Sequence, residues 1–107
     1  MTQVNQDTPA EPTLPKWLKL TDEGVTVTLK YKTLISGVQT DALTMRAPNM
    51  KDWRASKVAG NGDFEKQELS LFGSLVGLTE EELLTLKYKD YQRLSAGYFR
   101  LVDEDDV

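Results

Sequence analysis

Carboxylates are the main side chains here that could carry acid–base or metal chemistry, because the 107 residues contain no histidine and no cysteine. Glu80 to Glu82 open a predicted helix, where acids favour the free N–H groups of the first turn. The acidic run from Asp103 to Asp106 lacks the glycine-containing loop of an EF-hand calcium site. Gly60 to Gly62 lacks the lysine and hydroxyl residue of a phosphate-binding loop. We therefore expect no enzyme activity, no cofactor and no metal, and a protein that acts by binding.

The charge distribution argues against nucleic acid and membrane as partners. The formal charge is −4, and the four acids from Asp103 to Asp106 account for all of it, so the rest of the chain is near neutral. A basic cluster at Lys87, Lys89, Arg93 and Arg100 is offset by Asp90 and the acidic tail, which makes a DNA-recognition helix a poor prediction. Apolar runs are much shorter than the ~20 residues of a membrane span, and we expect no secretory leader.

The stretch from Gly24 to Pro48 predicts a β-hairpin. Val25, Val27, Leu29 and Tyr31 alternate with polar residues, the period of a half-buried strand. Ser36-Gly37 interrupts the run, and a second strand-like stretch continues to Pro48. An isolated hairpin is marginally stable in water, so we expect the residues that follow to cover one of its faces.

Four helices are predicted after the hairpin: 50–59, 64–76, 80–85 and 88–99. Their expected N-terminal caps are Asn49 with Asp52, Asp63, and Thr79 with Glu82. The first should end with a left-handed glycine within 60–62, and the second at Gly77. Gly73, inside the second helix, suggests a close approach by another element, and Gly97 should weaken the last helix near its end. The second helix has an expected buried stripe at Phe64, Glu68, Leu71, Phe72 and Leu75.

The predicted fold class is therefore α+β, a hairpin packed by three to four short helices. We divide the chain into a flexible proline-rich arm (1–16), one domain (17–101) and an acidic disordered tail (102–107). Trp17, Leu18 and Leu20 either pack onto the hairpin as a short third strand or turn, or form an exposed anchor; packing is the preferred interpretation.

The order of motifs from residue 24 to residue 94 resembles the tail assembly chaperone family of tailed bacteriophages. Three groups of residues carry the resemblance. The first is a strand, turn and strand ending in Arg-x-Pro: VTLKY (27–31), SGV (36–38) and LTMRAP (43–48). The second is the capped helix that follows, DWRA (52–55). The third is a pair of helical segments joined by Gly-Leu-Thr: ELSLF (68–72), LVGLTEEEL (75–83) and DY (90–91). The proline-rich arm and acidic tail have no counterpart in this pattern.

The resemblance implies a non-catalytic role in virion morphogenesis. Proteins of this family are expected to keep the long tape-measure protein soluble in the host cytoplasm until tail-tube subunits polymerise around it. They are expected to be absent from the mature virion, and an extended form made by ribosomal frameshifting is a further implied partner. The alternative is a structural tail component, such as a tube or completion protein, that remains in the particle.

A chaperone for an amphipathic helix needs an exposed apolar patch. Such a patch could be built from six residues, although most of them are also candidates for the core; Met50 and Tyr88, near helix starts, are the two expected to be exposed. The candidate partner-binding residues are Met50, Trp53, Phe72, Leu75, Tyr88 and Tyr91.

Overall fold

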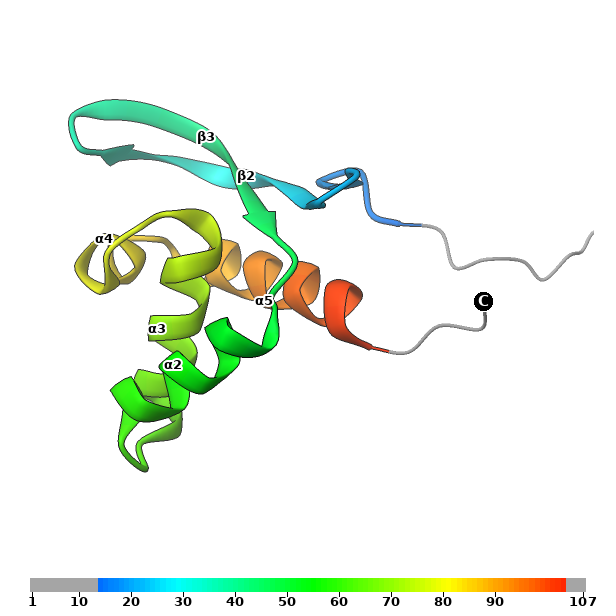
Figure 1. The fold of residues 1–107 in the computed structure, drawn as a ribbon. Helices are drawn as coiled ribbons and strands as arrows, with labels where there is room; N and C mark the ends of the chain where they lie inside the picture. Colours follow the sequence, from blue (N-terminus) through cyan, green and yellow to red (C-terminus); the bar gives the residue numbers. More distant parts are fainter. Residues whose placement is uncertain (1–13, 104–107) are drawn as a thin grey trace, which may run out of the picture.

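A computed structural model describes residues 14–103 and confirms the α+β class. A three-stranded antiparallel sheet is followed, in these residues, by four helices (Figure 1). The strands are β1 (Leu18–Leu20), β2 (Gly24–Ile35) and β3 (Val38–Arg46), and the helices are α2 (Met50–Gly60), α3 (Phe64–Val76), α4 (Glu80–Leu84) and α5 (Tyr88–Val102). Most of the predicted arm and tail, 1–13 and 104–107, lies outside the described residues, so the predicted domain boundaries stay predictions.

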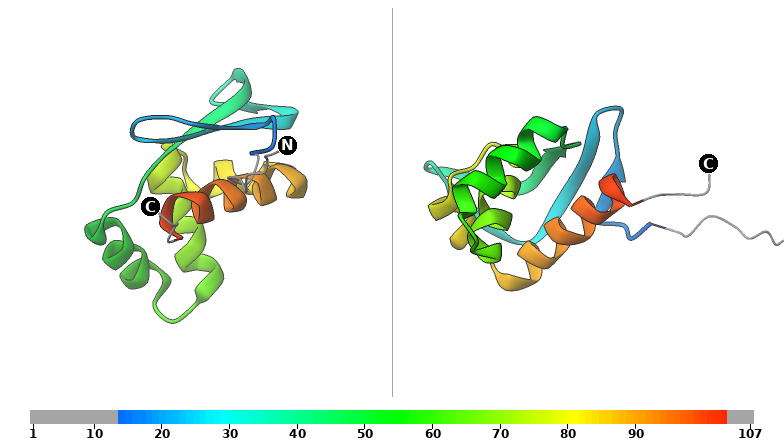
Figure 2. Two further views of the ribbon diagram at one scale, coloured as in Figure 1. Left: turned by 90° about the vertical axis from the view of Figure 1, so that its right-hand side faces the viewer. Right: turned by 60° about the horizontal axis from the view of Figure 1, so that its bottom comes forward.

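The sheet forms one layer and the helices form the other, as Figure 1 and the left view of Figure 2 both show. The strand order is β1-β2-β3, with β2 in the middle. Val25, Val27 and Met45 point into the layer boundary and are fully buried. The alternate residues carry hydroxyls on the opposite face, where the Thr26 and Thr44 side-chain oxygens lie 3.5 Å apart. Only one face of the sheet is therefore covered.

The hairpin turn lies where the sequence predicts it. Ser36 and Gly37 both have positive φ (52° and 80°), as the tight two-residue turns of β-hairpins require. The predicted alternation is correct through Leu29, which is buried, and wrong at Tyr31, which is exposed. The reason is an irregularity in the ladder between Thr28 and Thr33, where β2 carries more residues than β3 opposite it.

The segment after the arm packs onto the hairpin, as preferred from the sequence. Leu18 to Leu20 form the third strand and pair antiparallel with Val25 to Val27. Leu18 is buried, whereas Leu20 remains exposed.

The helix starts agree with the predicted caps. The side chains of Asn49, Asp63 and Thr79 each accept a hydrogen bond from a backbone N–H of the first turn. Gly77 takes the left-handed conformation after α3, as predicted. At the end of α2 the prediction of a glycine is wrong in detail: the cap residue is Asn61, with φ 49°, because asparagine also tolerates this region.

The core lies between the sheet and the helices α3, α4 and α5. The buried apolar residues are Leu18, Val25, Val27, Leu29, Leu43, Met45, Leu69, Leu71, Phe72, Leu75, Leu83, Leu86 and Leu94. The stripe predicted for α3 is wrong at its first two members, because Phe64 is 84% exposed at the start of that helix and Glu68 is also exposed.

Two glycines mark close approaches. A Cβ on Gly73 would lie 2.7 Å from the carbonyl oxygen of Leu78, which confirms the predicted close contact. Gly97 does not weaken the end of its helix: α5 continues to Val102, and a Cβ there would lie 3.1 Å and 3.2 Å from the Cγ2 atoms of Val25 and Val27. Gly97 is thus the point where α5 crosses closest to the sheet.

The close crossing at Gly97 gives a stability prediction. We expect Gly97→Leu to lower the free energy of unfolding by about 3 kcal/mol, because a large side chain would force α5 away from β2. The matched control is Ala96→Leu, one residue earlier on the exposed side of the same helix, where we expect a change within about 0.5 kcal/mol. Urea denaturation of both variants measures the difference, and equal stability of the two would contradict the crossing.

Candidate functional site

The structure divides the six candidate binding residues among three places. Phe72 and Leu75 belong to the core, and each is almost inaccessible to solvent. In this conformation neither is available to a partner. Phe72 instead packs its ring against Tyr91 and Tyr98, with ring centroids 5.5 Å and 5.1 Å apart.

Met50 and Trp53 lie together in an apolar groove of about 490 Å³. We call this the α2 groove. Its walls come from the start of α2, the middle of α3 and the end of α5. Three of its apolar side chains face solvent: Met50 is 66% exposed, Trp53 41% and Val102 43%. The lining residues are Pro48, Asn49, Met50, Trp53, Leu71, Tyr98 and Val102.

Tyr88 and Tyr91 line a second hollow of about 410 Å³, which we call the α4–α5 groove. The Tyr91 hydroxyl donates a hydrogen bond to Oε2 of Glu68 over 2.6 Å. Burial, and then the Glu68 carboxylate, raise the pKa of Tyr91 far above its usual value, so this phenol stays protonated as a donor. Tyr88 is exposed. The lining residues are Glu65, Glu68, Leu69, Leu83, Leu84, Leu86, Tyr88, Tyr91 and Gln92.

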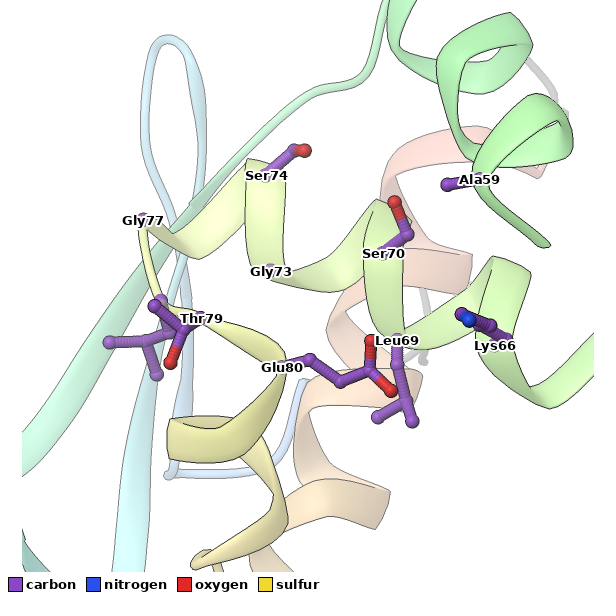
Figure 3. Close-up of a pocket in the computed structure, with 10 residues that line it drawn as sticks. Ala59, Lys66, Leu69, Ser70, Gly73, Ser74, Gly77, Thr79 and Glu80 are labelled. Atoms are coloured by element: carbon purple, nitrogen blue, oxygen red, sulfur yellow. The ribbon is translucent and has the colours of Figure 1, made fainter.

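A third hollow, of about 500 Å³, lies between α3 and the start of α4 (Figure 3). The wall on the α3 side is made largely of small residues, with Ser70, Gly73 and Ser74 on the helix and Gly77 at its C-terminal cap. Figure 3 shows Thr79 and Glu80 across from this wall. None of the six candidate residues lies here, and the hollow lacks the exposed large apolar side chains that distinguish the α2 groove.

An ion pair connects the start of α2 to the last residue of β3. Arg46, the last residue of β3, donates from both terminal nitrogens to the two carboxylate oxygens of Asp52, over 2.7 Å and 2.9 Å. Asp52 also accepts the backbone N–H of Asn49 and so completes the helix cap. The hydrogen bonds from Arg46, and then from Asn49, lower the pKa of Asp52 to about 2. This network holds Met50 and Trp53 at the mouth of the groove.

The other wall depends on α5, which is anchored by Asp90. This side chain is fully buried, and its Oδ1 and Oδ2 accept the backbone N–H groups of Lys30 and Tyr31 over 2.6 Å and 2.9 Å. Two consecutive N–H groups pointing to one acceptor are a consequence of the irregularity in β2. Asp90 therefore anchors the start of α5 to the irregular part of the strand.

Arg93 adds a second contact one turn along α5. Its Nη1 donates to the carbonyl oxygen of Thr28 over 2.8 Å, and its guanidinium lies 5.0 Å from the ring centroid of Trp17. The Thr28 N–H in turn donates to the carbonyl oxygen of Trp17 over 2.8 Å. β1 is short and pairs only with Val25 to Val27 of β2. Beyond that pairing, Asp90 and Arg93 of α5 make hydrogen bonds to the backbone of β2.

Sequence reasoning missed the anchoring roles of Asp90 and Arg93, because it considered their charges only in the charge balance of the last helix. A signal was present: Asp90, Leu94 and Gly97 are spaced i, i+4 and i+7, so they share one helical face. A carboxylate on the same face as a buried leucine must find donors, and the nearest donors are backbone N–H groups of the sheet.

Residues 14–103 contain no group of three acidic, histidine or cysteine side chains placed to hold a metal ion. No helix in this part of the chain combines the length and apolar character needed to cross a membrane.

The family model described as "Phage tail assembly chaperone proteins, E, or 41 or 14" matches residues 26–103. The match spans 78 of 107 residues (103 − 26 + 1), well over half of the chain. The chain belongs to this family. The resemblance seen in the sequence is thus confirmed, and it supports a chaperone role in tail assembly. No curated protein and no solved structure matches the chain.

The match to the tail assembly chaperones covers both apolar grooves and the anchoring residue Asp90. It begins within β2, so β1 and Trp17 precede it. The elements that form the grooves are therefore those of the family, whereas the cation–π contact of Arg93 uses a residue from outside the matched region.

The anchoring role of Asp90 predicts a large loss of stability on its removal. We expect Asp90→Ala to cost about 3 kcal/mol, because two partly buried N–H groups lose a charged acceptor. Asp90→Asn should cost about 2 kcal/mol, since one acceptor oxygen remains. The control is Asp41→Asn, an exposed aspartate on β3, which should change stability by less than about 0.5 kcal/mol. A loss below ~1 kcal/mol for Asp90→Ala in urea denaturation would contradict the anchor.

The lowered pKa of Asp52 predicts a pH dependence. Because the folded-state pKa, about 2, is below the ordinary 3.8, the stabilisation by Asp52 is fully present above about pH 4 and disappears as the pH falls through 2. The Tm difference between the wild type and Asp52→Asn should therefore be constant from pH 7 to about pH 5 and shrink toward pH 2. A difference that does not change between pH 5 and pH 2 would show that Arg46 does not stabilise the ionised carboxylate.

Proposed function

We propose that this chaperone binds the tape-measure protein through the α2 groove during tail assembly, without catalysis, and leaves before the particle is complete. Family membership supports the chaperone role, and the groove supports the mode of binding. The observation that supports this proposal most directly is the exposure of three apolar side chains, Met50, Trp53 and Val102, in one groove. Exposed apolar side chains gathered in a groove commonly mark a protein-binding surface.

The groove suits a helical client. An amphipathic helix presents apolar residues at i, i+3, i+4 and i+7, and such a stripe fits a concave apolar groove. Trp53 supplies a large flat surface and Met50 a flexible one, so together they can accommodate segments of varied sequence. Varied sequence is what a chaperone of a long helical protein has to accept.

Co-expression with the tape-measure protein tests this proposal. The wild-type chaperone should keep that protein in the soluble fraction, and Met50→Asp or Trp53→Asp should lower the affinity by about 30-fold, the effect of losing a central apolar contact. The matched control is Val58→Asp on the same helix, because Val58 is 79% exposed but does not line the groove. Circular dichroism should show that all three variants fold.

Two outcomes would count against the proposal. If the tape-measure protein is equally soluble with and without the chaperone, it is not the client. If Val58→Asp impairs binding as strongly as Met50→Asp, the α2 groove is not the binding site. Detection of the protein at stoichiometric level in purified particles would instead favour the structural tail component.

A further inference from the structure

A basic side chain, Lys57, lies beside the α2 groove. The Lys57 ammonium lies 4.7 Å from the centroid of the Trp53 ring, which places a positive charge beside a lining residue. The acidic residue of the same helix, Asp52, is already paired with Arg46. Lys51 and Arg54 add two more exposed positive charges to α2. Asp103, an exposed acid, follows Val102 at the end of α5.

The α4–α5 groove has the opposite charge on its lining. Glu65 and Glu68 both line it, and Glu68 accepts the Tyr91 hydroxyl. Lys57 and Glu68 therefore place opposite charges next to two apolar hollows on the same small domain. A partner with an apolar stripe alone would not distinguish these sites, whereas a partner with flanking charges would.

We propose that the α2 groove selects amphipathic helical segments whose apolar stripe is flanked by acidic residues. The proposal rests on the function proposed above and adds the chemistry of the client. Apolar contacts with Met50 and Trp53 provide the affinity, and the positive charge of Lys57 beside Trp53 selects among segments. A client segment flanked by lysines meets like charges at this groove and is disfavoured there.

Two synthetic amphipathic peptides test the selection. Both carry leucine at the same i, i+3, i+4 and i+7 positions, and they differ only in having glutamate or lysine beside the stripe. The chaperone is used as the full chain with Trp17→Phe, which leaves Trp53 as the only tryptophan and its fluorescence as the readout. We expect the glutamate peptide to bind about tenfold more tightly at low salt, and the ratio to fall below about threefold in 0.5 M NaCl.

Charge reversal at one position separates the groove from the overall charge of the protein. Lys57→Glu should reduce the preference for the glutamate peptide to about twofold or less. Lys66→Glu makes the same change in net charge at an exposed lysine on α3, outside the α2 groove, and should leave the preference unchanged. An equal loss in both variants would show that net charge, not the groove, makes the selection.

The remaining outcomes are also decisive. Equal affinity for both peptides, or a preference for the lysine peptide, overturns the charge selection. If neither peptide changes the fluorescence of Trp53, the groove does not take such helices and the inference fails. The proposed function fails separately, by the co-expression experiment, because that experiment uses the tape-measure protein whatever its flanking charges are.

Discussion

The hydrogen bonds between Asp90 and the backbone of β2 are the constraint on which both grooves depend. They connect the start of α5 to the irregular part of the strand, over 2.6 Å and 2.9 Å. Helix α5 then runs across the sheet with Gly97 at the closest approach and ends at Val102. Tyr88 near its start lines the α4–α5 groove, and Tyr98 and Val102 near its end line the α2 groove. A rotation or shift of this one helix would reshape both sites.

Helix α2 is held in a different way. Only Ser56 and Gly60 are buried along it, and both are small. The Ser56 hydroxyl donates to the carbonyl oxygen of Trp53 over 2.7 Å, and a Cβ on Gly60 would lie 2.7 Å from Cβ of Gln67 on α3. Close helix contact, the cap and the Arg46–Asp52 pair thus replace the apolar burial that usually stabilises a helix. An element with few buried apolar contacts belongs to the less stable part of a fold, which is compatible with the proposed role of α2 as a wall of the binding groove.

Local signals in the sequence predicted most of the elements. The turn at Ser36-Gly37 and the capping boxes at Asn49 and Thr79 depend on short-range hydrogen bonds, and such bonds can be read from neighbouring residues. The exposure of Tyr31 and Phe64 could not be read this way. Tyr31 follows an irregularity created by pairing between distant strands, and Phe64 lies at a helix start beyond the edge of the core.

The candidate site was predicted in part for the same reason. Met50 and Trp53 do lie together, since they share one face of one helix. Phe72 and Leu75 have the same apolar character but occupy the core, because α3 is covered by the sheet and by other helices. Spacing identifies which residues share a face, whereas only the packing of elements distant in sequence decides whether that face meets protein or solvent.

The exposure of an apolar groove on a protein of this size has a physical consequence. A domain with few apolar residues needs its large side chains for the core, yet this chaperone leaves Trp53 and Met50 partly in water. Lys57 reduces that cost, because its ammonium lies 4.7 Å from the centroid of the Trp53 ring and interacts with the ring face. The same lysine therefore contacts the exposed ring and places a positive charge beside the groove. A partner with acidic flanks could use this charge without requiring the lysine to leave the ring, and a partner with basic flanks could not.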